Sequence, residues 1–221
     1  MPIEFEAPKP ITNAQFVLKT VAEEMMRPKS RYFDEHEHEI PWDYIEFMHS
    51  AMKAMGGSSL APKENGNGKD AEKEKRPPIG YQLIAAQLEA LSWGDVGMYH
   101  CLPGGGLGAA AVHSAGTADQ RVKFLSRFNG DKPTFAAMCI TEAGAGSDNS
   151  AIRTRAVLDE KTNEWVINGE KIFVTGGDKS FTEYEKLGRG FIVVWASIDP
   201  SAKRAGMRAF VVEGGTKGVE V

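Results

Sequence analysis

Cysteine is scarce in this chain, and long apolar runs are missing from it. The 221 residues contain only Cys101 and Cys139, so a disulfide framework is not expected. No stretch of about 18 apolar residues occurs, which argues against a transmembrane helix. The first residues, MPIEFEAPKP, have neither an apolar secretory core nor an arginine-rich amphipathic presequence. These absences favour the reducing cytoplasm as the compartment.

An excess of positive charge is also absent. The chain has 26 Lys and Arg against 30 Asp and Glu, which gives a net charge of −4. Without a basic field, neither a nucleic acid nor an anionic membrane is expected as a partner. A hydrophobic content of 42% with 25% charged residues is typical of a globular protein.

Glycine, in contrast, is plentiful and is concentrated in two similar motifs. MCITEAGAGSDNS (Met138–Ser150) follows a β-prone run and contains Gly144 and Gly146. NGEKIFVTGG (Asn168–Gly177) again combines a β-prone run, a threonine and glycines. Glycine permits backbone angles that expose consecutive N–H groups and lets a ligand approach the backbone closely. The two motifs therefore predict strand ends that form walls around a flat polar ligand.

Helical periodicity extends over residues 11–130. Thr117 and Gln120 have the spacing of a capping box, and we expect the helix that they start to end at Asn129–Gly130. Apolar residues spaced by three and four predict two earlier helices and the start of a third, and a glycine- and alanine-rich segment predicts a fourth. These helices are expected at Thr12–Met26, at Trp42–Met55, from Ile79 onward and at Gly104–Gly116.

From Thr134 onward, short β-prone runs alternate with turn residues, which is typical of antiparallel strands. The order of helices followed by strands favours segregated α and β domains. We therefore predict an α+β fold, with an α-helical domain over residues 1–131 and an antiparallel, barrel-like β domain over residues 132–221. The expected strands are Thr134–Thr141, Arg153–Leu158, Glu164–Ile167, Glu170–Thr175, Phe191–Ser197 and Met207–Val212.

One segment differs from its surroundings. Ala61–Pro78, with the sequence APKENGNGKDAEKEKRPP, is charged and turn-rich and has almost no apolar anchors. It is interpreted as a mobile surface loop between helices.

Several segments together resemble the acyl-CoA dehydrogenases, flavoenzymes that desaturate acyl-CoA thioesters. TEAGAGSD resembles the signature of that family, and WVINGEKIFVTGG resembles its second flavin-contacting strand. The resemblance continues through GTADQRVKFLSRFNGDKPTFAAMCITE, FIVVWASIDP and GMRAFVVEGGTKGVEV. Spaced segments in the family's order are much more specific than one glycine-rich loop.

The resemblance implies a site for FAD. Residues at the positions of Thr141 and Thr175 hydrogen-bond the isoalloxazine ring in this family, and Phe173 stands where a tryptophan usually lies against the flavin. Taken singly, each threonine would be an ordinary strand residue, but their order with the flanking matches favours the flavin role. The candidate cofactor-binding residues are Met138, Ile140, Thr141, Gly146, Ser147, Phe173 and Thr175.

Ser147 has a second implied role, because the serine at this position contacts the cofactor or the CoA part of the substrate. The alternative is a simple Gly-Ser turn capped by Asp148. Glu142 and Asp148 are interpreted as acceptors that fix the loop rather than as catalysts.

The family's order of domains implies that part of the active site lies elsewhere. A helical domain, a β domain and a carboxy-terminal helical bundle follow one another, and this sequence ends before the bundle and before the β domain would be complete. The bundle normally carries the glutamate that removes the α-proton. No catalytic residue is therefore assigned here, and the base is expected beyond Val221. The implied partners are an acyl-CoA substrate, an electron-transfer flavoprotein, and either a homo-oligomer of the tetrameric type or a complementing carboxy-terminal chain.

The expected function is FAD-dependent α,β-desaturation of an acyl-CoA by an amino-terminal portion or split subunit. A non-catalytic partner subunit of a heteromeric dehydrogenase is one alternative, and a flavin oxidase or monooxygenase of the same fold is another. The presence of Thr141, Ser147 and Thr175 argues against complete loss of the cofactor site.

Other residues with reactive side chains form weaker patterns. His36 and His38 alternate with carboxylates in DEHEHE, as metal ligands can. No further ligand cluster follows, so a solvated stretch is preferred and no metal site is predicted. His100 and Cys101 lack a nucleophile-elbow pattern. GGGLG at Gly104–Gly108 follows a helical region rather than a strand, which excludes a dinucleotide fingerprint.

Overall fold

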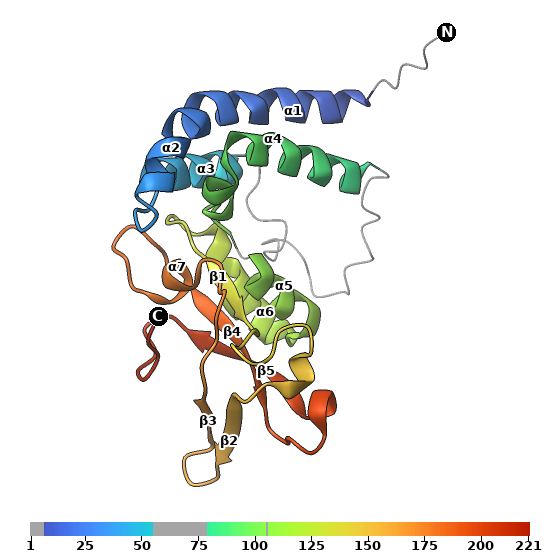
Figure 1. The fold of residues 1–221 in the computed structure, drawn as a ribbon, viewed down its shortest axis with the longest axis vertical. Helices are drawn as coiled ribbons and strands as arrows, with labels where there is room; N and C mark the ends of the chain where they lie inside the picture. The colour runs from blue at the N-terminus through green and yellow to red at the C-terminus, as the bar shows by residue number, and fades with distance from the viewer. Residues whose placement is uncertain (1–6, 55–78, 105) are drawn as a thin grey trace. The chain divides into compact units, whose positions relative to one another are not determined.

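The computed structural model describes residues 7–54, 79–104 and 106–221 (Figure 1). The predicted loop Ala61–Pro78 lies outside the described residues. The described residues form two compact units, one from residues 7–48 and 79–102 and the other from residues 49–54, 103–104 and 106–221. Within the described ranges, no helix is long and apolar enough to cross a membrane.

The first unit consists of helices. The predicted helix Thr12–Met26 is continuous with a second one, since a short π-helix joins the two α-helices. The last helix is bent at Asp95 (φ −170°, ψ 119°), whose Oδ1 accepts the backbone N–H of Met98 at 2.7 Å and so caps the part that follows the bend. The elements are α1 (Lys9–Val21), η1 (Ala22–Met26), α2 (Arg27–Glu35), α3 (Trp42–Ala54), which continues into the other unit, and α4 (Gly80–His100).

Close packing of η1 against α4 depends on Gly94. Ala22 and Met26 have no exposed surface, and α4 lies directly against this π-helical turn. A Cβ atom added at Gly94 would lie 2.8 Å from Ala22 Cβ and 3.0 Å from Met26 Sδ. A side chain at this position would therefore push the two helices apart.

Replacing Gly94 by leucine is expected to lower the free energy of unfolding by roughly 1–3 kcal/mol, because the core has no room for the added atoms. Gly97→Leu in the same helix is the matched control. A Cβ there meets only the side-chain oxygen of Asp95, at 3.2 Å, and the residue is exposed. Urea unfolding of both variants is the measurement, and equal losses would contradict the packing role of Gly94.

The second unit is built on a five-stranded sheet. Strand β4 (Phe191–Ser197) lies at its centre and pairs in parallel with β1 (Ala136–Cys139) and antiparallel with β5 (Met207–Glu213). It also meets β2 (Arg155–Asp159) in a single parallel pair, and β2 pairs antiparallel with β3 (Glu164–Asn168). The α+β class is confirmed, but the sheet is mixed rather than antiparallel throughout.

Helices α5 (Gly106–Ala115) and α6 (Ala118–Leu125) belong to this second unit, and α5 packs on β1 (Figure 1). The predicted capping box is confirmed at the start of α6. Gln120 N–H donates to Thr117 Oγ1 at 3.2 Å, and Thr117 N–H donates to Gln120 Oε1 at 2.9 Å. The two compact units separate near Leu102. The domain limits 1–131 and 132–221 stay a prediction.

Apolar side chains cover β4 through two clusters. One contains α5 and α6 side chains with Phe191 and Val193, and the other contains the short helix α7 (Gly177–Phe181) with Ile192 and Val194. Alternate residues of β4 therefore enter different clusters, as the period of a strand requires. Both clusters bury the central strand β4, which makes it a rigid support for the segments that follow β1.

Candidate functional site

The first glycine motif forms a tight loop directly after β1. Glu142 and Ala145 exchange two backbone hydrogen bonds, each 3.1 Å long, and so close a turn. A Cβ added at Gly144 or Gly146 would meet no atom within 4 Å, so both glycines face open space. Gly146 and Ser147 are exposed on this loop. The loop surface is therefore accessible to a ligand.

The second motif lies alongside the first. The backbone N–H of Ile172 donates to the carbonyl of Thr141 at 2.9 Å, and Lys171 Nζ donates to the carbonyl of Ile140 at 2.9 Å. Segments that are some thirty residues apart in the sequence are thereby joined side by side. The two motifs were predicted to form walls around a flat ligand, and a direct bond between them was not predicted.

The predicted strand Glu170–Thr175 was wrong. Strand β3 ends at Asn168, and the following residues have no regular structure up to the turn at Thr175. Phe173 has a left-handed backbone (φ 57°), and the Ile172 N–H bonds to the loop after β1 instead of a neighbouring strand. Thr175 therefore precedes α7 and does not end a strand.

The candidate cofactor residues differ in their exposure. Met138 in β1, and Ile140 and Thr141 after it, are half-buried, whereas Thr175 is exposed and Phe173 is 87% exposed. Within the described part of the chain, the hydroxyls of Thr141, Ser147 and Thr175 have no hydrogen-bond partner. The structure brings the Thr141 and Phe173 segments together, and it shows Gly146 and Ser147 on the loop that begins at Thr141.

Glu142 is the most heavily hydrogen-bonded side chain of the motif. Its carboxylate accepts the N–H of Arg153 at 2.6 Å, the N–H and Oγ1–H of Thr154 at 2.9 and 2.6 Å, and a bond from Lys171 Nζ at 2.8 Å. Burial alone would raise the pKa of Glu142, but the hydrogen bonds from Lys171, Thr154 and the backbone outweigh it and lower the pKa to about 2. The loop-fixing interpretation of Glu142 is confirmed.

Asp148 also fixes the loop. Its Oδ1 accepts the Ser150 N–H at 3.2 Å and the Ser150 hydroxyl at 2.5 Å. These two bonds hold the pKa of Asp148 below its ordinary value. Sequence reasoning did not single out Lys171, although its charge, opposite to that of Glu142, in the second of two motifs expected to enclose one ligand was a usable signal.

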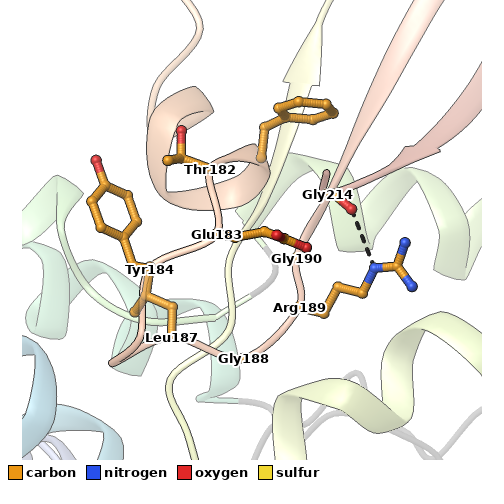
Figure 2. Close-up of a pocket in the computed structure, with 9 residues that line it drawn as sticks. Thr182, Glu183, Tyr184, Leu187, Gly188, Arg189, Gly190 and Gly214 are labelled. Carbon is orange, nitrogen blue, oxygen red and sulfur yellow. Dashed lines mark hydrogen bonds between the residues drawn. The ribbon is translucent and has the colours of Figure 1, made fainter. Parts of the chain in front are cut away.

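A small pocket elsewhere in the second unit is not the candidate site. The loop from Thr182 to Gly190 lines it together with Gly214 (Figure 2). It lies where β1 and β4 begin, since Ala136 pairs with Phe191, whereas Thr141 follows the end of β1. Arg189 Nε is already bonded to the Gly214 carbonyl at 3.2 Å. None of the sequence-predicted residues lines this pocket.

Metal ligation finds no support in the histidine-rich segment. His36 stacks on Tyr32 with ring centroids 4.3 Å apart, and its Nδ1 lies 2.9 Å from the Tyr32 carbonyl. No group of three His, Cys, Asp or Glu side chains that could hold a metal ion occurs among residues 7–54, 79–104 and 106–221.

Comparison with known proteins finds a family model, sequence relatives and solved structures that resemble this chain. Residues 137–221 match the family model of the acyl-CoA dehydrogenase middle domain. The chain is 32% identical over 201 residues to a probable medium-chain specific acyl-CoA dehydrogenase 2, mitochondrial, of Caenorhabditis briggsae, a match that covers 90% of the chain and 43% of the relative. It is 37% identical over 113 residues to acryloyl-CoA reductase (NADH) of Anaerotignum propionicum, covering 50% of the chain and 26% of that protein.

A solved structure of an acyl-CoA dehydrogenase complexed with FAD from Bacillus anthracis has the same fold. The TM-score is 0.64 at 23% identity, with 97% of this chain and 32% of that chain covered. The chain therefore spans less than half the length of these relatives. The family-model match includes both glycine motifs, which lie side by side in the structure. We conclude that the chain belongs to the acyl-CoA dehydrogenase family.

Proposed function

We propose that this chain holds the isoalloxazine ring of FAD against the segments that carry Thr141 and Thr175. As an amino-terminal portion or split subunit, it would serve the α,β-desaturation of an acyl-CoA. The observation that carries this proposal is the hydrogen bond from Ile172 N–H to the Thr141 carbonyl, 2.9 Å long, which joins the two family motifs into one surface. Fold and family alone would not fix the chemistry.

The residues present fit a flavin. The joined segments offer the partner-free hydroxyls of Thr141 and Thr175, which are neutral groups that can bond the polar edge of the ring. Phe173 leaves an aromatic side chain 87% exposed, and its burial against a flat ring would be favourable. The charges of Glu142 and Lys171 are buried and paired, so they do not add a net charge to this surface.

When bound, FAD would accept the hydride from the substrate's β-carbon. The residues of this chain would bind and orient its ring, and Ser147 would contact the cofactor or the CoA moiety. Glu142 is unsuited to act as the base, because its carboxylate is committed to donors and has a pKa lowered to about 2. Because the family resemblance puts the base on the carboxy-terminal bundle, we place it outside residues 1–221. An electron-transfer flavoprotein, and either a homo-oligomer or a complementing carboxy-terminal chain, complete the proposal.

Cysteine chemistry supports a reducing compartment. Neither Cys101 nor Cys139 forms a disulfide. Cys139 is buried in β1, and burial raises the pKa of its thiol to about 11, so it stays protonated and unreactive. Two free thiols are compatible with the cytoplasmic location that the proposal includes.

Thr175→Val is expected to weaken FAD binding about 2- to 10-fold, which corresponds to the loss of one hydrogen bond. Valine keeps the shape of threonine and removes only the hydroxyl. Thr182→Val is the matched control, because Thr182 is also an exposed threonine of the second unit but lines the pocket at the other end of β1. Quenching of FAD fluorescence on titration with protein measures both affinities. Equal affinities in the two variants would exclude a contact through Thr175.

The proposed function itself is tested by flavin absorption spectra of the purified chain with added FAD. Binding should shift the visible absorption bands of the flavin and sharpen their fine structure as the ring leaves water. A spectrum identical to that of free FAD at saturating protein would refute the proposal. If the chain binds flavin and substitutions at Thr141, Phe173 or Thr175 do not change its affinity, the flavin lies elsewhere.

A further inference from the structure

Glu142 and Lys171 form a buried ion pair beside the two motifs. Glu142 Oε1 and Lys171 Nζ are 2.8 Å apart, and the side chains are 9% and 8% exposed. Lys171 Nζ also donates to the Ile140 carbonyl at 2.9 Å. Buried charges are tolerated when they are paired and hydrogen-bonded. The charged group of each side chain is therefore held in one defined position.

This pair fixes the register of one segment on the other. Lys171 contacts Ile140 and Glu142, the residues on either side of Thr141, while the N–H of Ile172 bonds to Thr141 itself. Consecutive residues of the first segment are thus held against consecutive residues of the second. The hydroxyl of Thr141 is carried on backbone that this arrangement holds in place.

Glu142 also anchors the glycine loop at its far end. The carboxylate that bonds Lys171 accepts the backbone N–H groups of Arg153 and Thr154, where the chain enters β2. The side chain of Glu142 therefore holds both ends of the loop that carries Gly146 and Ser147. Together with the Glu142–Ala145 turn and the bonds of Asp148, this carboxylate holds the loop, whereas the glycines face open space.

We propose that Glu142 and Lys171 are the positioning pair of the flavin site and keep its two segments at the separation that FAD requires. This inference rests on the proposed function. A positioning role predicts a loss of FAD affinity beyond what a general loss of stability explains. A purely structural role predicts that affinity follows stability.

The test compares Lys171→Met with Val193→Ala in the 221-residue chain. Val193 is 1% exposed in the cluster with α5 and α6, so its truncation lowers stability. Its backbone pairs with Met138 in β1, but the truncation removes no hydrogen bond of Glu142 or Lys171. Lys171→Met is expected to raise the Kd for FAD at least about tenfold above that of Val193→Ala, since a hydrogen-bonded charge is lost. Lys171→Arg keeps the charge and should restore most of the affinity. If Lys171→Met does not fold, the double variant Glu142→Gln with Lys171→Met removes both charges and replaces it.

Hydrogen exchange in the FAD-free chain gives an independent readout. The amide of Ile172 should exchange markedly faster in Lys171→Met than in Val193→Ala, because its bond to Thr141 lies between the two segments that the ion pair holds together. Equal exchange, or equal FAD affinity, in the two variants overturns the positioning role. A wild-type chain that binds no FAD refutes the proposed function and the pair's flavin role together. A wild-type chain that binds FAD, but no more tightly than Lys171→Met does, refutes only the role of the Glu142–Lys171 pair in the flavin site.

Discussion

Residues 1–221 with added FAD are expected to desaturate acyl-CoA about 10²–10⁴-fold more slowly than the same chain supplied with the carboxy-terminal half of a family member. A positioned general base typically contributes a factor of this size. Glu142, a carboxylate of the joined segments, is held by Lys171 and by the backbone of Arg153 and Thr154. It has no free position from which to reach an α-proton.

The assay uses several acyl-CoAs with an artificial electron acceptor, and the chain is tested with and without the added half. Flavin content is measured in each sample, so that weak FAD retention is not mistaken for a missing base. Robust turnover by residues 1–221 alone, abolished by Glu142→Gln in a variant that still unfolds cooperatively, would place the base on Glu142. No turnover in either sample, despite bound FAD, would favour the non-catalytic partner subunit.

Glu142→Gln is expected to lower the free energy of unfolding by about 3 kcal/mol at neutral pH. Folding lowers the pKa of Glu142 from 4.5 to about 2, and a tenfold change in a proton's binding constant corresponds to about 1.4 kcal/mol. Because the folded pKa is the lower one, this stabilisation is fully present above pH 4.5 and is lost as the pH falls towards 2. The gap between wild type and variant should therefore shrink over this window.

Urea unfolding at pH 7, 5, 4 and 3 measures that gap. Glu160→Gln is the control, because Glu160 is exposed in the turn between β2 and β3, and surface substitutions usually change stability by less than about 0.5 kcal/mol. A gap that stays constant down to pH 3, or a Glu142→Gln variant as stable as Glu160→Gln at pH 7, would contradict the ion-pair account.

Local sequence signals were sufficient for much of the fold. The capping box at Thr117 and Gln120 lies within one helical turn, and strand β4 has the predicted bounds Phe191–Ser197. Pairing between distant strands was not predictable, because nothing local distinguishes a parallel neighbour from an antiparallel one. The parallel contact of β1 with β4 turned the predicted antiparallel sheet into a mixed one.

In the candidate site too, some features were predictable from the sequence and others were not. The two motifs were expected to form walls around one flat ligand, and the structure joins them directly through Ile172 and Thr141. The β-propensity of Ile172, Phe173 and Val174 suggested a strand, but the tertiary bond to Thr141 and the left-handed Phe173 overrode it. Lys171 was missed although its charge is opposite to that of Glu142, because the sequence does not show which residues of the two motifs meet.

The parallel pairing of β1 with β4 also bears on how the chain folds. Ala136 is registered with Phe191, so both motifs and the β2–β3 hairpin lie in the excursion between two neighbouring strands. The hairpin, and the antiparallel pair of β4 with β5, can form early because their partners are close in sequence. Docking of β1 must wait for closure of the long excursion. We expect the ligand-facing segments to acquire their final arrangement in the last, slowest step of refolding.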